Sequence, residues 1–377
     1  MLEASCQIIA DVQGIVFRQP MEFERPKYSF ADVDKAGRIL ASGADMDSAE
    51  GAWAVEVLNN WRAAHNWPLR TVTEAVRLYA TSVTPKAIVP YRIKRLPTII
   101  DKLQRLTGGV SLSQMPDIGG CRAIVHTVKD VERIVALCRE NISGHKLGWE
   151  KPYIDEPKKD GYRSHHLIVR FQSDEPVYAE DDGLLTEIQI RSRLQHAWAT
   201  TVETVDVFQQ TAIKTGRGPK GWRELFRLMS AVFALKENTS VVSGVPRNLD
   251  DLTAKIKALC LRHKTENFLE SCRMTITSHD RKVEKPYYQL IIFDAKHIQT
   301  WTLSYERHEA ELAFSKLAKV EKEASGRDQY VVLVSIESLN ALREAYPNYW
   351  IDVGPFLKEL TDLTGWWPNQ DDVKIIP

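Results

Sequence analysis

Residues 157–171 read PKKDGYRSHHLIVRF and join two kinds of sequence that decide what this chain can be. The first part is a turn that carries lysines, an aspartate, a glycine, a tyrosine and an arginine. The second part is an apolar run typical of a buried strand. A solvated hairpin does not need so many charged groups around an aromatic ring. The turn therefore predicts a site for a ligand that carries both phosphate and a ring.

The sequence on both sides of this stretch alternates between strand-like and helix-like runs. Apolar residues that recur every three or four positions predict helices, and short β-branched runs predict strands. The predicted strands are 121–128, 166–171 and 184–191, and the predicted helices lie within 30–83, 91–106, 129–140, 192–208 and 221–238. This mixture predicts an α/β (α+β) fold with a mixed β-sheet flanked by helices.

The chain has 377 residues, which is enough for more than one domain. We expect an N-terminal helical extension at 1–84, a main domain at 85–242 and a smaller α+β C-terminal domain at 243–377. The stretch SGVPRNLDD at 243–251 is the best linker candidate. Within the C-terminal domain the pattern predicts strands at 271–278, 286–294 and 329–336, and helices at 250–267, at 305–324 and near the end.

Composition excludes several classes of protein. No apolar run is long enough for a membrane span, and the first twenty residues lack the basic start of a signal peptide. Five cysteines without a CxxC pair predict reduced thiols in the cytoplasm. Because the net charge is zero, contact with phosphate or nucleic acid must come from local patches. The most basic loop, at 214–223, carries Lys214, Arg217, Lys220 and Arg223.

Three more clusters supply the charges that a phosphate site needs. They are Arg92, Lys94, Lys102 and Arg105; Asp117 and Arg122 in DIGGCR; and Glu187, Gln189 and Arg191 in EIQIR. A helix over 91–106 would let its cations face one polyphosphate. Alternate strand residues share a face, so EIQIR presents its acid, amide and guanidinium together. The separated carboxylates Asp117 and Glu187 among these cations indicate Mg²⁺ and a triphosphate.

Each cluster alone also fits an ordinary structural role. Basic residues on a helix are usually a solvated face, a DxGG sequence is usually a turn, and an alternating E-x-Q-x-R is usually the solvated side of an edge strand. Two adjacent histidines are more often structural than catalytic. It is the occurrence of all four clusters in one order that favours a functional site.

In that order the motifs resemble the synthetase domain of RelA/SpoT proteins. The matching pieces are RIKRLPTIIDKLQR, DIGGCRAIV, PKKDGYRSHHLIV and EIQIRSRLQHAWATTVE, within about 85–206. The resemblance implies an ATP-dependent pyrophosphokinase that transfers the β,γ-pyrophosphate of ATP to a ribose hydroxyl. The family usually has asparagine before the Gly-Tyr pair, whereas this chain has Asp160, which adds negative charge where acceptor phosphates are expected.

The resemblance also implies a role for each matching residue. Arg92, Lys94, Lys102, Arg105 and Arg122 would bind ATP, Asp117 and Glu187 would hold Mg²⁺, and Lys158, Tyr162, His166, Gln189 and Arg191 would bind the acceptor. Tyr162 would stack on the acceptor base, and Glu187 would accept the proton of the attacking hydroxyl. The paired His-Asp motif of the family's hydrolase domain has no upstream counterpart, because the single HD, at 279–280, follows the synthetase motifs.

The C-terminal region is similar in layout to that of the fused toxin–antitoxin, capsid-sensing CapRel group. That resemblance implies a pseudo-zinc-finger-like domain whose YxxY motif, here Tyr346 and Tyr349, blocks the ATP site until a phage structural protein binds. An alternative is that the two tyrosines pack an ordinary loop. Zinc is the disfavoured interpretation of Cys260, His263, Cys272 and His279, because their spacing matches no common finger.

Three functions remain open at this point. The first is a translation-blocking toxin in phage defence that modifies the 3′ CCA end of tRNA, favoured by the fused layout, Asp160 and the basic loop at 214–223. The second is a (p)ppGpp alarmone synthetase that uses GDP or GTP. The third is a non-catalytic sensor, which is disfavoured because every acid and cation that the chemistry needs is present.

Overall fold

The computed structural model describes most of the chain. The described residues are 24–94, 96–106, 111–142, 144–173, 181, 183–208, 218–263, 265–266, 268–270, 288–294, 299–309, 312, 316, 319–320, 323, 329–335 and 353–366. They belong to two compact units. Unit 1 comprises residues 1–152 and 164–193, and unit 2 comprises residues 153–163 and 194–377.

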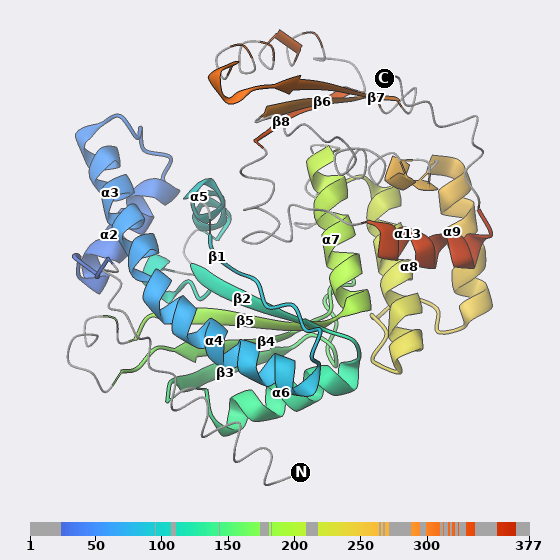
Figure 1. Cartoon of the computed structure of the whole chain (residues 1–377), viewed down its shortest axis with the longest axis horizontal. Helices are drawn as coiled ribbons and strands as arrows, with labels where there is room; N and C mark the ends of the chain where they lie inside the picture. Colours follow the sequence, from blue (N-terminus) through green and yellow to red (C-terminus); the bar gives the residue numbers. More distant parts are fainter. Residues whose placement is uncertain are drawn as a thin grey trace. The chain divides into compact units, whose positions relative to one another are not determined.

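A five-stranded mixed sheet forms the centre of unit 1 (Figure 1). Its strands are β1 (Tyr91–Ile93), β2 (Gly119–Val125), β3 (Lys146–Pro152), β4 (His165–Arg170) and β5 (Leu185–Ser192), in the order β1-β2-β5-β4-β3. Only β2 and β5 pair in parallel; the other neighbours are antiparallel. The predicted mixed sheet is therefore confirmed, and β2, β4 and β5 correspond to the three predicted strands.

The strand register sorts the side chains onto two faces, because residues opposite each other across a pair of strands point the same way. One face, which we call the polar face, carries Arg92, Arg122, Lys151, His166, Glu187, Gln189 and Arg191. The other face carries buried apolar residues, among them Ala123, Leu167, Ile188 and Ile190. This separation puts the charged residues of four different strands on one surface.

Helices α4 (Asn66–Val83) and α6 (Val128–Glu140) pack against the strands and cover the apolar face. The α4 residue Thr73 hydrogen-bonds the thiol of Cys121 on β2, which places α4 on this side of the sheet. A capping box begins α6, because Thr127 Oγ1 accepts from the Asp130 amide while the Asp130 carboxylate accepts from the Thr127 amide. The sheet is thus held from one side and leaves its polar face for ligands.

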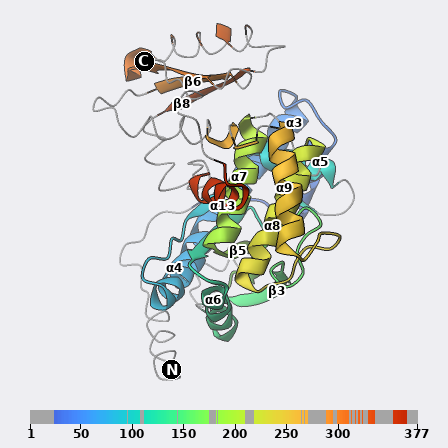
Figure 2. The ribbon, with the colours of Figure 1, turned by 90° about the vertical axis from the view of Figure 1, so that its right-hand side faces the viewer.

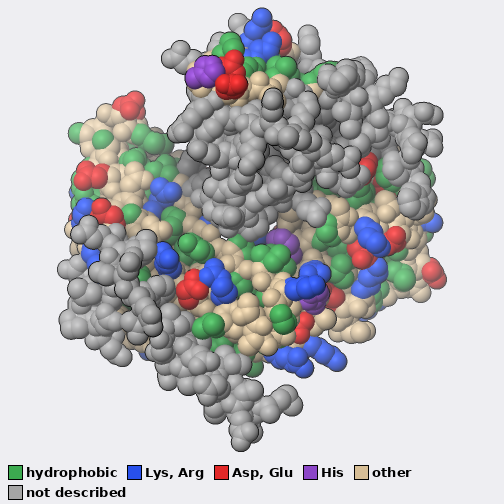
Figure 3. Space-filling view, in the orientation of Figure 1, with side chains coloured by type: hydrophobic (Ala, Val, Ile, Leu, Met, Phe, Trp, Pro, Cys, Tyr) green, Lys and Arg blue, Asp and Glu red, His purple; other side chains and the backbone are tan. Residues whose placement is uncertain are grey.

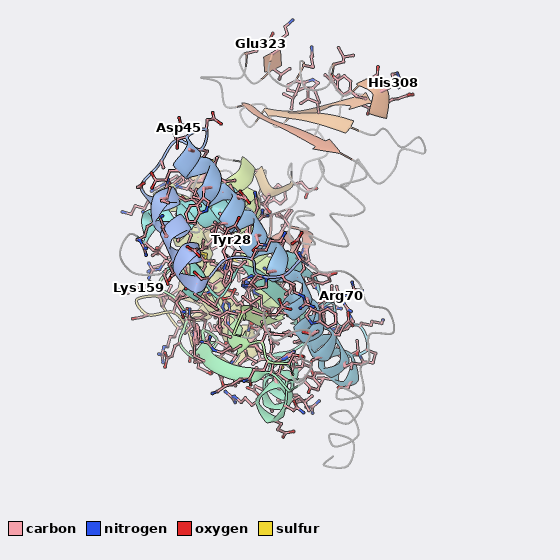
Figure 4. The ribbon with its side chains drawn as sticks, turned by 90° about the vertical axis from the view of Figure 1, so that its left-hand side faces the viewer. Tyr28, Asp45, Arg70, Lys159, His308 and Glu323 are labelled. Carbon is pink, nitrogen blue, oxygen red and sulfur yellow. The ribbon has the colours of Figure 1, made fainter. Side chains whose placement is uncertain are left out.

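A second core in unit 1 lies between α2 (Phe30–Ala41), α3 (Ala49–Ala64), α5 (Leu96–Arg105) and the short 3₁₀ helix Leu112–Gln114. Its largest fully buried side chain is that of Trp61. Tyr28 and Asp45, labelled in Figure 4, lie before and after α2. Helix α5 buries Ile99 and Leu103 in this core, which fixes how the helix presents Lys102.

The expectation of one helix over 91–106 is wrong. Tyr91–Ile93 form β1, which pairs with β2, and α5 begins only at Leu96. The second residue of α5 is Pro97, which lacks an amide hydrogen and is tolerated only in the first turn of a helix. Arg92 and Lys94 therefore do not share a helical face with Lys102; they reach the site from the strand. Strand β3, whose sequence KLGWEKP lacks a clear alternation, was not predicted.

Four helices form the main core of unit 2: α7 (Arg193–Phe208), α8 (Lys220–Glu237), α9 (Leu249–His263) and α13 (Gly354–Thr364) (Figure 2). Phe226 and Phe233 of α8 both contact Phe356 of α13, with ring centroids 5.6 and 5.7 Å apart. The predicted linker at 243–251 joins two helices that pack on each other, α8 and α9. The two compact units therefore do not coincide with the domain limits expected from sequence.

The three remaining strands form an antiparallel sheet in the order β7-β6-β8. They are β6 (Tyr288–Asp294), β7 (Gln299–Tyr305) and β8 (Gln329–Ser335). Strands β6 and β8 were predicted and β7 was not. The predicted strand at 271–278 and most of the predicted helix at 305–324 lie outside the described residues.

The surface agrees with a chain of zero net charge. Figure 3 shows acidic and basic side chains interspersed over the face seen there. Within the described part of the chain, no helix has the length and apolarity needed to cross a lipid bilayer.

Segment 153–163 belongs to unit 2 although it lies between two strands of unit 1. A buried ion pair anchors it: Arg163 Nη1 lies 3.1 Å from Glu237 Oε2, and the two side chains are only 2% and 8% exposed. Arg163 also donates to Thr239 Oγ1 at 2.7 Å, and Gln195 donates to Glu237 Oε2 at 3.1 Å. The turn quoted at the start is therefore fixed to the end of α8.

We expect Arg163→Met to lower the free energy of unfolding by about 3–5 kcal/mol, because it leaves Glu237 as a buried charge without its partner. The double variant Arg163→Met/Glu237→Met should recover most of this loss, since it removes both charges. Urea unfolding followed by tryptophan fluorescence measures both. A double variant that is no more stable than Arg163→Met would contradict the ion pair as the anchor.

Candidate active site

Two lysines hold the carboxylate of Asp117. Lys94 Nζ lies 2.7 Å from Oδ2, and Lys102 Nζ lies 2.7 Å from Oδ1. Lys94 follows β1, Lys102 lies on α5, and Asp117 precedes β2, so three elements meet at this point. Burial alone would raise the pKa of Asp117, but the two lysines outweigh burial and lower it. The carboxylate is therefore ionised at neutral pH.

Glu187 is the carboxylate of the polar face, and 12% of its side chain is exposed. His166 Nδ1 donates to its Oε1 at 3.0 Å, and Gln189 Nε2 donates to its Oε2 at 2.7 Å. Burial would raise its pKa, but the hydrogen bond and charge of His166, the Gln189 bond and the charge of Lys102 together lower it well below the usual range. An ionised carboxylate only accepts hydrogen bonds, so His166 must carry its proton on Nδ1.

The amide of Gln189 connects Glu187 to two arginines. Its Oε1 accepts from Arg191 Nη2 at 2.7 Å and from Nε and Nη2 of Arg122, both at 3.3 Å. The parallel register sets Arg122 directly opposite Gln189, which explains this contact. The structure thus brings together five of the predicted residues, Arg122, His166, Glu187, Gln189 and Arg191, as one hydrogen-bonded group.

Asp117 and Glu187 are close enough to influence each other, since Glu187 raises the pKa of Asp117. Oxygen ligands from one or two carboxylates, completed by substrate phosphates, are what Mg²⁺ usually takes from a protein. Among the described residues there is no set of three or more acids, histidines or cysteines that could hold a metal without such help. The pair therefore fits a Mg²⁺ ion that arrives with phosphate.

The remaining predicted ATP ligands differ in their surroundings. Arg92 lies on β1 opposite Gly120. Burial lowers the pKa of Lys94, and the nearby charges of Lys102 and Arg92 add to this effect. Arg105 lies at the end of α5 and pairs with Asp101, one turn earlier on the helix, at 2.9 Å. Arg92 thus belongs to the polar face, whereas Arg105 faces an exposed carboxylate on its own helix.

The two adjacent histidines have different roles because adjacent strand residues point to opposite faces. His166 reaches Glu187, whereas His165 Nε2 lies 2.9 Å from Glu150 Oε2 on the other face. Glu150 also accepts from Arg139 of α6, and this hydrogen bond is the main reason that the pKa of Glu150 falls to about 2. His165 is therefore a structural link between strand and helix, which the period of two predicts once the strand is known.

Lys158 and Tyr162, the predicted acceptor residues of unit 2, lie on either side of a tight turn. Lys158 Nζ lies 4.8 Å from the Tyr162 ring centroid and 4.5 Å from that of Tyr153. This is cation–π geometry, and the two rings meet edge to face. Trp198 of α7 packs against the Tyr162 ring as well, with centroids 6.3 Å apart. Sequence reasoning missed Tyr153, whose only signal was its closeness to the turn.

Asp160 and Gly161 set the shape of this turn. Asp160 Oδ1 accepts from the Tyr162 amide at 2.9 Å, a role that the amide oxygen of asparagine could fill equally. Gly161 has φ +97°, and a Cβ there would lie 2.9 Å from the Cβ of Ser230. Ser230 Oγ donates to the Gly161 carbonyl at 2.5 Å, so only glycine fits this close approach.

Several predicted residues lie outside the described residues. They are the proposed tyrosine lid, Tyr346 and Tyr349, the loop cations Lys214 and Arg217, and the disfavoured zinc ligands Cys272 and His279. The members of these groups that the structure does describe lie on helices α8 and α9. Cys260 is buried in the core of unit 2, and Lys220 and Arg223 lie in the first turn of α8.

Comparison with known proteins agrees with the geometry. Residues 91–207, from β1 into α7, match the region found in RelA / SpoT proteins. GTP pyrophosphokinase YjbM of Bacillus subtilis is 29% identical over 136 residues, which are 35% of this chain and 60% of that protein. GTP pyrophosphokinase rsh of Brucella ovis is 34% identical over 108 residues, 29% of this chain and 13% of that protein. The chain thus matches well under two thirds of these relatives' lengths.

Solved structures give weaker likenesses. The small alarmone synthetase 2 of Bacillus subtilis superposes with a TM-score of 0.41 at 20% identity, covering 48% of this chain and 94% of that one. Small alarmone synthetase 1 of the same organism, bound to its product pppGpp, gives 0.39 at 22% identity, covering 48% and 94%.

The lowered pKa of Glu187 makes a prediction about acid stability. A carboxylate with a depressed folded pKa stabilises the fold above its unfolded pKa of about 4.3, and this contribution is lost as the pH falls toward the folded value. Between about pH 6 and pH 3.5, the contribution of one such group to the free energy of unfolding should fall by about 1 kcal/mol.

We therefore expect the free energy of unfolding of Glu187→Gln to fall less over this interval than that of the wild type. For the control Asp101→Asn, which removes an exposed carboxylate, the free energy of unfolding should fall by as much as it does for the wild type. Urea titrations at the two pH values give these slopes. Equal slopes for Glu187→Gln and the wild type would contradict a depressed pKa at Glu187.

Proposed function

We propose that the protein transfers the β,γ-pyrophosphate of ATP to a ribose hydroxyl, because residues 91–207 match the region found in RelA / SpoT proteins. The hydroxyl oxygen attacks the β-phosphorus, the bond from that phosphorus to the α,β-bridging oxygen breaks, and AMP leaves. The proton of the hydroxyl passes to a base. The products are AMP and an acceptor that carries a pyrophosphate.

One observation carries this proposal: the Glu187 carboxylate is ionised and is held on both oxygens by hydrogen bonds. A carboxylate with a fixed orientation and a charge at neutral pH suits the base that accepts the hydroxyl proton. Its donors His166 and Gln189 come from two neighbouring strands, so its position depends on the sheet and not on a loop. We assign Glu187 as the base, with the hydroxyl of the acceptor next to it.

The cations around Asp117 supply the ATP side of the site. Lys94, Lys102, Arg92 and Arg122 come from β1, α5 and β2, next to Glu187. In the structure Lys94 and Lys102 neutralise Asp117. Polyphosphate would compete with Asp117 for these ammonium groups, and charge neutralisation of this kind is the main catalytic device of phosphoryl-type transfer.

Asp117 and Glu187 are the residues that would hold Mg²⁺. The ion would neutralise charge on the phosphates when bound. The triphosphate would attract Lys94 and Lys102 away from Asp117. The Asp117 carboxylate would then be available, together with Glu187, for Mg²⁺.

For the acceptor, we favour a guanine nucleotide. The curated relatives are named GTP pyrophosphokinases, and their identity of 29–34% to this chain falls in the synthetase region. The turn of unit 2 supplies Tyr162 for a base and Lys158 for phosphate, as the family resemblance implies. Asp160 takes part in this turn through one oxygen, so it leaves the shape of the turn unchanged.

A second candidate acceptor is the 3′-terminal adenosine of tRNA. The extra negative charge of Asp160 disfavours a highly charged free nucleotide, and the basic residues Lys220 and Arg223 at the start of α8 could hold an RNA backbone. A phage-defence toxin of this type would need control by its C-terminal region. That control, through Tyr346 and Tyr349 and a phage structural protein as the trigger, is a hypothesis that rests on the resemblance alone.

A radiolabel assay distinguishes the two acceptors. ATP labelled at the γ-phosphate is incubated with GDP, GTP or tRNA, and we expect label in the guanine nucleotide. Glu187→Gln should reduce transfer at least about 100-fold, because the base and its charge are lost. The exposed acid Glu132, changed to Gln, serves as the control and should retain wild-type transfer. Label in tRNA alone would favour the second candidate, and label in none would reject the proposed function.

Tyr162→Ala tests the acceptor turn separately. Loss of a stacking ring should weaken acceptor binding by about 1–3 kcal/mol and leave ATP binding nearly unchanged. Tyr162→Phe keeps the ring and should bind as the wild type does. Isothermal titration with each nucleotide measures both. Equal losses for ATP and acceptor would show that the tyrosine supports the fold of the turn and does not bind the base.

A further inference from the structure

Arg191 is the most deeply buried cation of the polar face, with 3% of its surface exposed. It lies two residues after Gln189 on β5, and so on the same side of the sheet. Its Nη2 donates to Gln189 Oε1 at 2.7 Å, and its Nε donates to Ser164 Oγ at 3.4 Å. Ser164 in turn donates to the Ile190 carbonyl at 3.2 Å, so the guanidinium has a second, fixed contact.

These bonds determine which way the Gln189 amide faces. A glutamine amide can present either its oxygen or its NH₂ group to a neighbour. With the oxygen toward the guanidinium, the NH₂ group meets Glu187 and every contact is favourable. With the amide reversed, NH₂ would oppose a guanidinium and the oxygen would oppose a carboxylate. The arginine therefore selects the orientation that donates to Glu187.

We infer that Arg191 is a positioning residue for the proposed reaction, acting through Gln189 on Glu187, and not a ligand of the acceptor. This inference rests on the proposed function, in which Glu187 is the base. It differs from the role that the family resemblance implies, which placed both Arg191 and Gln189 on the acceptor.

Arg122 cannot replace Arg191 in this role. Its two contacts with Gln189 Oε1 are longer, at 3.3 Å each. It is also one of the cations assigned to ATP, so phosphate would compete with Gln189 for its guanidinium. Arg191 keeps the amide in place whether or not ATP is bound, because its other partner, Ser164, belongs to the sheet.

The consequence for Glu187 can be measured. The groups that face its carboxylate are His166 on β4, Gln189 on β5, Lys102 on α5 and Asp117 before β2, with Arg122 and Arg191 behind Gln189. Without Arg191 the amide keeps only its longer contacts with Arg122 and can reverse more easily. Glu187 then loses one of the two hydrogen bonds that hold its carboxylate in place.

The experiment compares Arg191→Met and Arg191→Lys with the wild type and with Arg139→Gln. Arg139 donates to Glu150 on the opposite face of the same sheet and serves as the arginine control. Rates are measured against acceptor concentration with saturating ATP. We expect Arg191→Met to lower kcat about 10–100-fold and to leave the KM for the acceptor nearly unchanged. Arg191→Lys, which still donates to Gln189, should recover part of the loss in kcat.

A second measurement does not depend on turnover. The side-chain ¹⁵NH₂ signals of Gln189, assigned with Gln189→Leu, report the hydrogen bonds of this amide and should shift in Arg191→Met. If the wild type transfers no pyrophosphate, the proposed function fails, and these signals still decide the hydrogen-bond relay. Circular dichroism verifies that each variant is folded.

Two results would overturn the inference. An Arg191→Met protein with unchanged kcat and a raised KM for the acceptor would identify Arg191 as an acceptor ligand. A folded Arg191→Met protein whose Gln189 amide signals equal those of the wild type would show that Gln189 does not need the arginine. Should Arg191→Met not fold, Arg191→Lys provides the same comparisons.

Discussion

The parallel pairing of β2 with β5 is the constraint on which the site depends. It sets Gly120 beside Glu187 and Arg122 beside Gln189, so the absence of a side chain at one position leaves space next to Glu187. On the other side of β5, the antiparallel β4 brings His166 opposite Gln189. A slip of one residue in either pairing would turn the polar row toward the apolar core under α4 and α6.

Helices α4 and α6 explain why this register is stable. They bury the apolar face of the sheet, and the same alternation that sends Ile188 and Ile190 into that core sends Glu187, Gln189 and Arg191 to the opposite surface. Burial of the apolar side therefore fixes the geometry of the polar side. The same alternation of residues along β5 thus stabilises the fold and orients the Glu187 carboxylate.

Ion pairs and hydrogen bonds balance the charges of the polar face. Asp117 offsets Lys94 and Lys102, while Glu187 is stabilised by His166 and Gln189. The proposed triphosphate with Mg²⁺ would bring both signs of charge at once, so it could replace these pairs without leaving a charge alone.

The amino-acid sequence by itself determined the strands at 121, 166 and 184, the helices after them, and the set of residues that carries the chemistry, because hydrophobic period and charge are local properties. The alternation in EIQIR also put three polar groups on one face. Only the tertiary structure decided which residues pair. It placed Arg92 on a strand and Lys94 directly after it, and it put His165 and His166 on opposite faces of the sheet. It also joined Gln189 by hydrogen bonds to both Glu187 and Arg191. Register and long-range contact, which set these outcomes, depend on residues far apart in the chain.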